Sequence, residues 1–242
     1  MIRFFRKVRK KVLSESKYKQ YFIYAIGEIL LVAIGILIAV QVNNWNTSQK
    51  RNVLEKQMLR EVKVGLEADL SDININLKGH LKILNSQNII IEWLDSNREY
   101  SDSLSYHFPN VSSGTVFLSN YGPYKTLNQI GIRLISNDRL RDQITKVYDI
   151  VYEGYSMHNK IYKEFQISFH KNINESHFES TNRSGMMKPL DIIKIKSDNE
   201  YSYQIKTIRD WNMFLIESNI RMAKREVIKT IEMISNELQI EE

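Results

Sequence analysis

Apolar residues dominate one early stretch of the chain. Residues 21–42 read YFIYAIGEILLVAIGILIAVQV and contain one charged residue, Glu28, while residues 29–40 have no polar side chain. As a helix, 22 residues span about 33 Å, which is enough to cross the ~30 Å core of a bilayer. A buried core helix is usually shorter, and a cleaved signal peptide has a shorter apolar core before a small-residue cleavage site. We therefore predict an uncleaved transmembrane anchor over residues 21–42.

The pattern after this span is that of a long amphipathic helix. Apolar residues recur at intervals of three or four from Leu59 to Leu84, and Ile91 continues the series after a gap of seven. This near-heptad spacing, typical of coiled coils, predicts one helix over about residues 46–96, a stalk that continues the membrane helix. Gly65 and Gly79 weaken the helix slightly and allow a bend.

Three further helices are predicted, at residues 123–130, 138–171 and 199–240. The segments between them, 97–123 and 172–199, are rich in polar residues and read as long connections, although residues 190–196 (LDIIKIK) could form one short strand. No helix can bury its apolar face alone, so the helices should pack as an antiparallel bundle. The expected fold class is all-α, with a helical domain over residues 43–242.

Charge is concentrated at the N-terminus. The chain carries a formal charge of +6, and residues 1–20 alone carry eight Lys or Arg against one Glu. The remainder is close to neutral, which argues against a nucleic-acid-binding domain. By the positive-inside rule, residues 1–20 should be cytoplasmic and residues 43–242 should lie across the membrane. Trp45 is placed to anchor the far interface.

The basic tail has a pattern of its own. Ile2, Phe5, Val8 and Val12 recur at helical spacing, which favours a basic amphipathic helix on an anionic leaflet over a disordered topology signal. The residues expected to contact lipid headgroups are Arg3, Arg6, Lys7, Arg9, Lys10 and Lys11.

Placing the carboxylate of Glu28 inside a membrane span costs free energy, so we expect a partner or another reason for its presence. Gly27, Glu28, Gly35 and Ala39 fall near one helical face, and Gly35 with Ala39 forms a small-xxx-small pair that lets a second helix approach. We predict that this face associates with another membrane helix. The alternative is a monomeric anchor whose Glu28 side chain reaches the interface.

The chain offers few candidates for chemistry. It has no Cys, and its five His include no pair at i, i+4 spacing. Sequences typical of zinc proteases, phosphate-binding loops and serine hydrolases are missing. We therefore predict no catalytic, metal-binding or cofactor-binding residues. Tyr148, Tyr152, Tyr155 and Tyr162 could line a ligand pocket but are more typical of a core.

Two stretches resemble a known family. They are YAIGEILLVAIGILIAVQVNNWN at residues 24–46 and YKTLNQIGIRLISNDRLRDQITKVYD at residues 124–149. Both resemble an uncharacterised family of Bacteroidota single-pass membrane proteins, a domain of unknown function without an established activity. The resemblance implies an inner-membrane location with a periplasmic helical domain. Asp102, Ser103 and Leu104 resemble the acceptor of Bacteroidota O-glycosylation.

Three functions are compatible with this sequence. We expect a membrane-anchored scaffold, subunit or accessory factor that acts through protein contacts with itself or a membrane partner and has no catalytic activity. The alternative is a periplasmic small-molecule sensor that signals through a partner, which a pocket with convergent polar groups would favour. A perturbed cluster of carboxylates and His would favour an enzyme.

Overall fold

The computed structural model describes residues 6–7, 10, 18–180 and 185–240. It divides into two units, residues 1–54 and residues 55–242. We call residues 22–42 the span and residues 55–242 the helical domain. The predicted lipid-contacting residues Arg3, Arg9 and Lys11 lie outside the described residues, and the backbone at Arg6, Lys7 and Lys10 is helical.

The fold is all-helical over the described residues, which confirms the predicted class. Its first described long element, α2, runs from Tyr18 to Leu94 and contains no proline, so that no backbone N–H is missing along it. The later elements are η1 (Asp102–Tyr106), α3 (Phe108–Val111), α4 (Gly122–Ile130), η2 (Ile132–Leu134), α5 (Asp138–Lys146), η3 (Val147–Tyr152), α6 (Glu153–Phe169), η4 (His170–Asn174), α7 (Glu175–His177), α8 (Ile192–Ser197), α9 (Asn199–Leu215), η5 (Ile216–Ile220) and α10 (Arg221–Ile240).

The possible strand at residues 190–196 is wrong. Residues Ile192–Ser197 form the short helix α8, and the side chain of Asp191 caps it by accepting the N–H of Lys194 at 3.0 Å. An N-cap carboxylate satisfies one of the free donors of a helix start, whereas a lone strand would leave its backbone groups unpaired. The nearest approach to a sheet among the described residues is one antiparallel bridge between Phe178 and Pro189.

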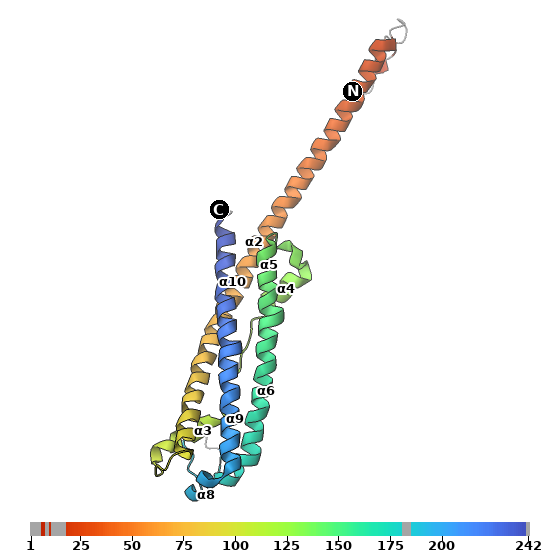
Figure 1. Ribbon diagram of the computed structural model, residues 1–242. Helices are drawn as coiled ribbons and strands as arrows, with labels where there is room; N and C mark the ends of the chain where they lie inside the picture. Colours follow the sequence, from red (N-terminus) through yellow and green to blue (C-terminus); the bar gives the residue numbers. More distant parts are fainter. Residues whose placement is uncertain (1–5, 8–9, 11–17, 181–184, 241–242) are drawn as a thin grey trace. The chain divides into compact units, whose positions relative to one another are not determined.

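Within the helical domain, α5 and α6 run in the same direction as the second half of α2 (Figure 1). Glu55 accepts the N–H of Ser136 at 2.6 Å, and further along Asp69 accepts the hydroxyl of Tyr152 at 2.8 Å. This parallel pair differs from the antiparallel order expected from the sequence. The reason is that the connection after α2 travels back along the domain before α5 begins.

The last two helices run the opposite way. Lys146 at the end of α5 pairs with Glu226 of α10 at 2.9 Å, and His158 of α6 bonds Asn219 of η5 at 2.9 Å. From the first contact to the second, the residue number rises along α5–α6 and falls from α10 to η5. The segment α9–α10 is therefore antiparallel to α5–α6. Figure 1 shows α9 between α2 and α6 in this view, with α2 passing behind α10.

The returning connection is an extended segment, residues 112–121, which we call the strap. The N–H of Leu118 donates to Asp72 at 3.1 Å, and the N–H of Asn120 donates to Asp69 at 2.6 Å. On the other side, Tyr162 of α6 donates its hydroxyl to the carbonyl of Ser113 at 3.1 Å. The strap therefore lies between α2 and α6 and connects the two parallel helices.

Glycine allows the strap to lie close against α2. A Cβ on Gly79 would stand 2.7 Å from the side chain of Thr115, and one on Gly65 would stand 3.4 Å from Pro123. The sequence suggested that these two glycines allow a bend. Their contacts show instead that they leave room for the strap and the start of α4.

The core contains a row of buried tyrosines, as expected for core residues. Tyr148, Tyr152, Tyr155 and Tyr162 are all at most 2% exposed. Phe117 of the strap stacks on Tyr155, with ring centroids 4.8 Å apart. These contacts pack one side of the strap against the core, while the other side stays exposed.

Candidate functional site

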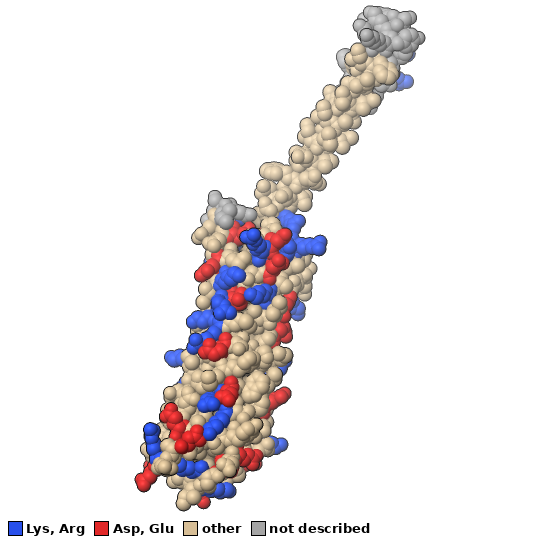
Figure 2. Space-filling model, viewed as in Figure 1, with Lys and Arg blue, Asp and Glu red and all other residues tan. Residues whose placement is uncertain are grey.

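The span is the first functional feature. One helix among the described residues is long and apolar enough to cross a membrane, and none of its most apolar window is buried. Figure 2 shows this part of the chain as an almost uncharged surface, while Lys, Arg, Asp and Glu are interspersed over the helical domain. So large an exposed apolar surface is unusual in a soluble protein and marks contact with lipid or with another protein.

The predicted association face is accessible. Gly27, Gly35 and Ala39 are exposed and Glu28 is partly exposed, and a Cβ added at Gly27 or Gly35 would meet no other atom within 4 Å. Trp45 is 66% exposed. Gly27, Gly35, Ala39 and Trp45 are therefore available for contact with lipid or a second helix.

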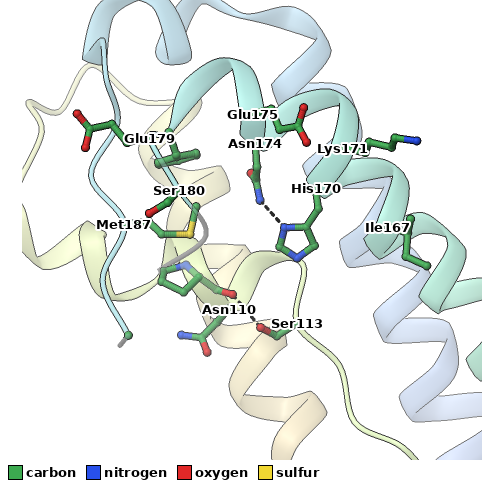
Figure 3. A pocket seen from close by; sticks show the side chains of 13 residues that line it. Asn110, Ser113, Ile167, His170, Lys171, Asn174, Glu175, Glu179, Ser180 and Met187 are labelled. Atoms are coloured by element: carbon green, nitrogen blue, oxygen red, sulfur yellow. Dashed lines mark hydrogen bonds between the residues drawn. The ribbon is translucent and has the colours of Figure 1, made fainter. Parts of the chain in front are cut away.

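The second feature is a cavity of about 980 Å³ in the helical domain, which we call the η4 pocket (Figure 3). Its walls come from α3, the beginning of the strap, the end of α6, η4 and the segment around α7. The lining residues are Pro109, Asn110, Ser113, Ile167, His170, Lys171, Asn174, Glu175, Phe178, Glu179, Ser180, Gly185 and Met187.

A π-helical turn supplies one wall of this pocket. η4 spans His170–Asn174, and π turns are rare, costly features that are frequent at functional sites. The side chains of His170 and Asn174 point toward one another on this wall, with 3.0 Å between the Asn174 amide nitrogen and Nδ1 of His170 (Figure 3).

His170 is held in one tautomer. Because the Asn174 amide nitrogen can only donate, Nδ1 of His170 accepts and Nε2 carries the proton, which it donates to Oγ of Ser112 at 3.0 Å. Burial lowers the pKa of His170, so its imidazole is neutral at pH 7. Both ring nitrogens are occupied, which leaves neither for proton transfer to a ligand in this arrangement.

A second group of polar residues lies in the core and joins three elements, α2, α9 and α3. His80 of α2 donates from Nδ1 to the Asn212 side chain at 2.7 Å, and Asn212 donates to Gln87 at 3.0 Å. Gln87 donates in turn to the carbonyl of Val111 at 2.8 Å. Burial lowers the pKa of His80, and its Nε2 has no protein partner. This chain of bonds fixes α9 and the end of α3 against α2.

Asp69 is the most unusual carboxylate of the domain. It is 1% exposed, and its described partners are two neutral donors, the N–H of Asn120 and the hydroxyl of Tyr152. Burial raises the pKa of Asp69, and these two hydrogen bonds offset only part of that effect. The residue attaches the strap to α2, and it is not associated with the η4 pocket.

The five histidines serve as bridges between elements. His80, His158 and His170 bond as described above, Nδ1 of His107 lies 3.1 Å from Ser86, and Nε2 of His177 lies 2.8 Å from Asp198. Among the described residues no group of three His, Asp or Glu is placed to hold a metal ion. Packing explains the positions of these histidines.

Sequence reasoning did not find the η4 pocket. Its residues come from two connections separated by more than fifty positions, and no motif links them. The one local signal was the i, i+4 pair His170 and Asn174 near the end of a predicted helix, a spacing that places both side chains on one face.

Comparison with known proteins identifies the family. Residues 28–182 match the Family of unknown function (DUF6090), and the chain belongs to this family. The match includes most of the span, the domain part of α2, the strap, α4–α6 and η4. No curated protein and no solved structure matches the chain.

Proposed function

We propose that this chain is a single-pass inner-membrane protein with a cytoplasmic N-terminus and a periplasmic helical domain. In this proposal the domain acts through protein contacts, as a scaffold, subunit or accessory factor, without catalysis. The observation that carries the proposal is the wholly exposed apolar span within a helix that continues into the domain. A bilayer covers such a surface and explains its length.

The proposed orientation rests on charge. Eight basic residues precede the span, against three, Lys50, Arg51 and Lys56, within the fifteen residues that follow it. The basic side chains before the span are also suited to bind the anionic cytoplasmic leaflet, at about 1 kcal/mol each near the surface. Trp45 is expected at the opposite interface.

Cysteine labelling tests the topology, because the chain has no Cys of its own. Single variants Ser16→Cys and Ser48→Cys are treated with a membrane-impermeant thiol reagent on intact spheroplasts. Ser48→Cys should react, whereas Ser16→Cys should react only after the membrane is permeabilised. Reaction of Ser16→Cys before permeabilisation, with Ser48→Cys protected, contradicts the orientation.

We further propose that the span associates with a second copy or with another membrane protein through Glu28, Gly35 and Ala39. Gly35→Leu and Glu28→Leu should each reduce crosslinking in membranes, since the first blocks close approach and the second removes a hydrogen-bonding group. Ala33→Leu is the matched control, because it adds a similar volume on the opposite side of the helix. Unchanged crosslinking in both test variants would show that the span is only an anchor.

The second candidate function is a small-molecule sensor, and the η4 pocket favours it. The cavity of about 980 Å³ brings amides, a hydroxyl and an imidazole together with apolar side chains. Such a combination is typical of ligand sites. In this second candidate function, the output would pass to a signalling partner.

A further inference from the structure

The polar groups inside the η4 pocket are uncharged. Asn110 donates one amide hydrogen to the carbonyl of Tyr106 and Ser113 donates its hydroxyl to the carbonyl of Pro109, as Asn174 donates to His170, so their oxygens remain as neutral acceptors and the amides keep a second hydrogen. His170 is neutral because burial lowers its pKa, and its two nitrogens are already bonded to Asn174 and Ser112. A charged ligand would find no buried counter-charge on these four side chains.

The charged residues of the pocket belong to its rim. Lys171, Glu175 and Glu179 are exposed, and Figure 3 shows Lys171 and Glu179 pointing outward on opposite sides. One positive and two negative groups give the rim neither the Arg or Lys cluster typical of phosphate sites nor a strong negative field. The rim therefore does not select an anion.

Apart from Ser180 and Gly185, the remaining lining is apolar, and the volume is large. Pro109, Ile167, Phe178 and Met187 contribute apolar side chains, of which Phe178 and Met187 are at most 4% exposed. A cavity of about 980 Å³ is at the upper end of the ~300–1,000 Å³ usual for small-molecule sites. The site thus combines surfaces for C–H groups with neutral donors and acceptors. Sugar rings present these two kinds of surface, C–H faces and hydroxyl edges.

We propose that the η4 pocket binds a neutral carbohydrate of one to three sugar rings. The proposal deepens the sensor function and rests on it. The pocket is tested without reference to topology or to association of the span, so a negative result here leaves those proposals standing.

Sugar titration of the full-length protein tests the proposal. The protein is kept in a polyoxyethylene detergent, because maltoside detergents carry a competing sugar. Maltose, cellobiose and N,N′-diacetylchitobiose are titrated by calorimetry and by ligand-observed NMR, with glucosamine and glucuronate as charged comparators. At least one neutral disaccharide should bind with a Kd below ~1 mM, and the charged sugars should bind at least about tenfold more weakly.

Variants assign the binding to the pocket. The double change Asn110→Ala with Ser113→Ala should weaken binding about tenfold, a loss of ~1.4 kcal/mol. Asn172→Ala is the matched control, because Asn172 belongs to η4 but bonds Ser168 at 3.3 Å and does not line the pocket. Unfolding temperatures are measured for each variant, and His170→Gln replaces the double variant if that one is unfolded. No binding of the three disaccharides up to ~10 mM, equal binding of charged sugars, or equal weakening by Asn172→Ala overturns the proposal.

Discussion

Asp69 shows how a single buried side chain can lower stability while fixing a segment. Its carboxylate is 1% exposed and its described hydrogen bonds come from neutral groups. Burial raises its pKa, so the folded protein holds a proton on this group more tightly than the unfolded chain does. By linkage, the contribution of Asp69 to stability falls as the pH rises from about 3.8 through the folded-state pKa.

Asp69→Asn should therefore stabilise the domain at pH 7, by roughly 1–2 kcal/mol, because it removes the buried charge while its oxygen still accepts from Asn120 and its amide nitrogen can donate to the Tyr152 hydroxyl oxygen. The gain should shrink as the pH falls through the raised folded-state pKa of Asp69, because the wild-type carboxyl is then itself protonated. Chemical denaturation of both proteins across this range measures the effect. Asp72→Asn is the control, since that half-buried carboxylate bonds the adjacent N–H of Leu118. A loss of stability in Asp69→Asn at pH 7 would show that the charged hydrogen bonds outweigh desolvation.

At the scale of elements, the strap depends on its fit against α2. The Cβ of Gly79→Ala would lie 2.7 Å from Thr115, a distance that forces the strap or the helix to shift. Overpacking of this kind costs about 1–3 kcal/mol, more than the ~1 kcal/mol gained from the better helix propensity of alanine. We therefore expect Gly79→Ala to lower the free energy of unfolding.

Gly154→Ala is the matched comparison for this prediction. Gly154 also lies inside a helix, α6, but a Cβ there meets no atom within 4 Å. This change should stabilise the domain by about 0.5–1 kcal/mol. The two variants should shift the thermal midpoint in opposite directions. Equal stabilisation by both would mean that the strap does not hold its close position against α2 in solution.

At the scale of the whole molecule, the helical domain is a separate compact unit of residues 55–242. Expressed alone, it should be strongly helical and unfold cooperatively, because its core and its buried hydrogen bonds lie within this range. Circular dichroism and denaturant titration measure both properties. A β-rich spectrum or a gradual transition would contradict an independent helical domain.

The sequence predicts the all-helical class of this fold better than it predicts how the chain runs from one helix to the next. Apolar residues at intervals of three and four indicate helices, and the described chain is all-helical. The strap escaped prediction because its residues alternate between half-buried and exposed positions while two exposed ones, Val116 and Leu118, are apolar. A period of two is then invisible in the pattern of polar and apolar residues. The parallel pair of helices follows from the strap and was missed with it.

The candidate pocket depends even more on tertiary structure. Asn110 and His170 are sixty positions apart, and their proximity follows from the return path of the strap and the π turn at η4. The span, in contrast, depends only on the local composition of the chain, and the sequence predicts it directly.

The position of α9–α10 at the end of the chain has a consequence for biosynthesis. Asn212 and Ile208 complete a core whose first half, on α2, leaves the ribosome more than one hundred residues earlier. Until residues 199–240 have emerged, the part of α2 that contains His80 and Gln87 lacks its contact with Asn212. The strap follows after η1 and α3 and can already pack against α2 at that stage of translation. The nascent chain is thus partly shielded by a segment that later lies between α2 and α6 in the finished domain.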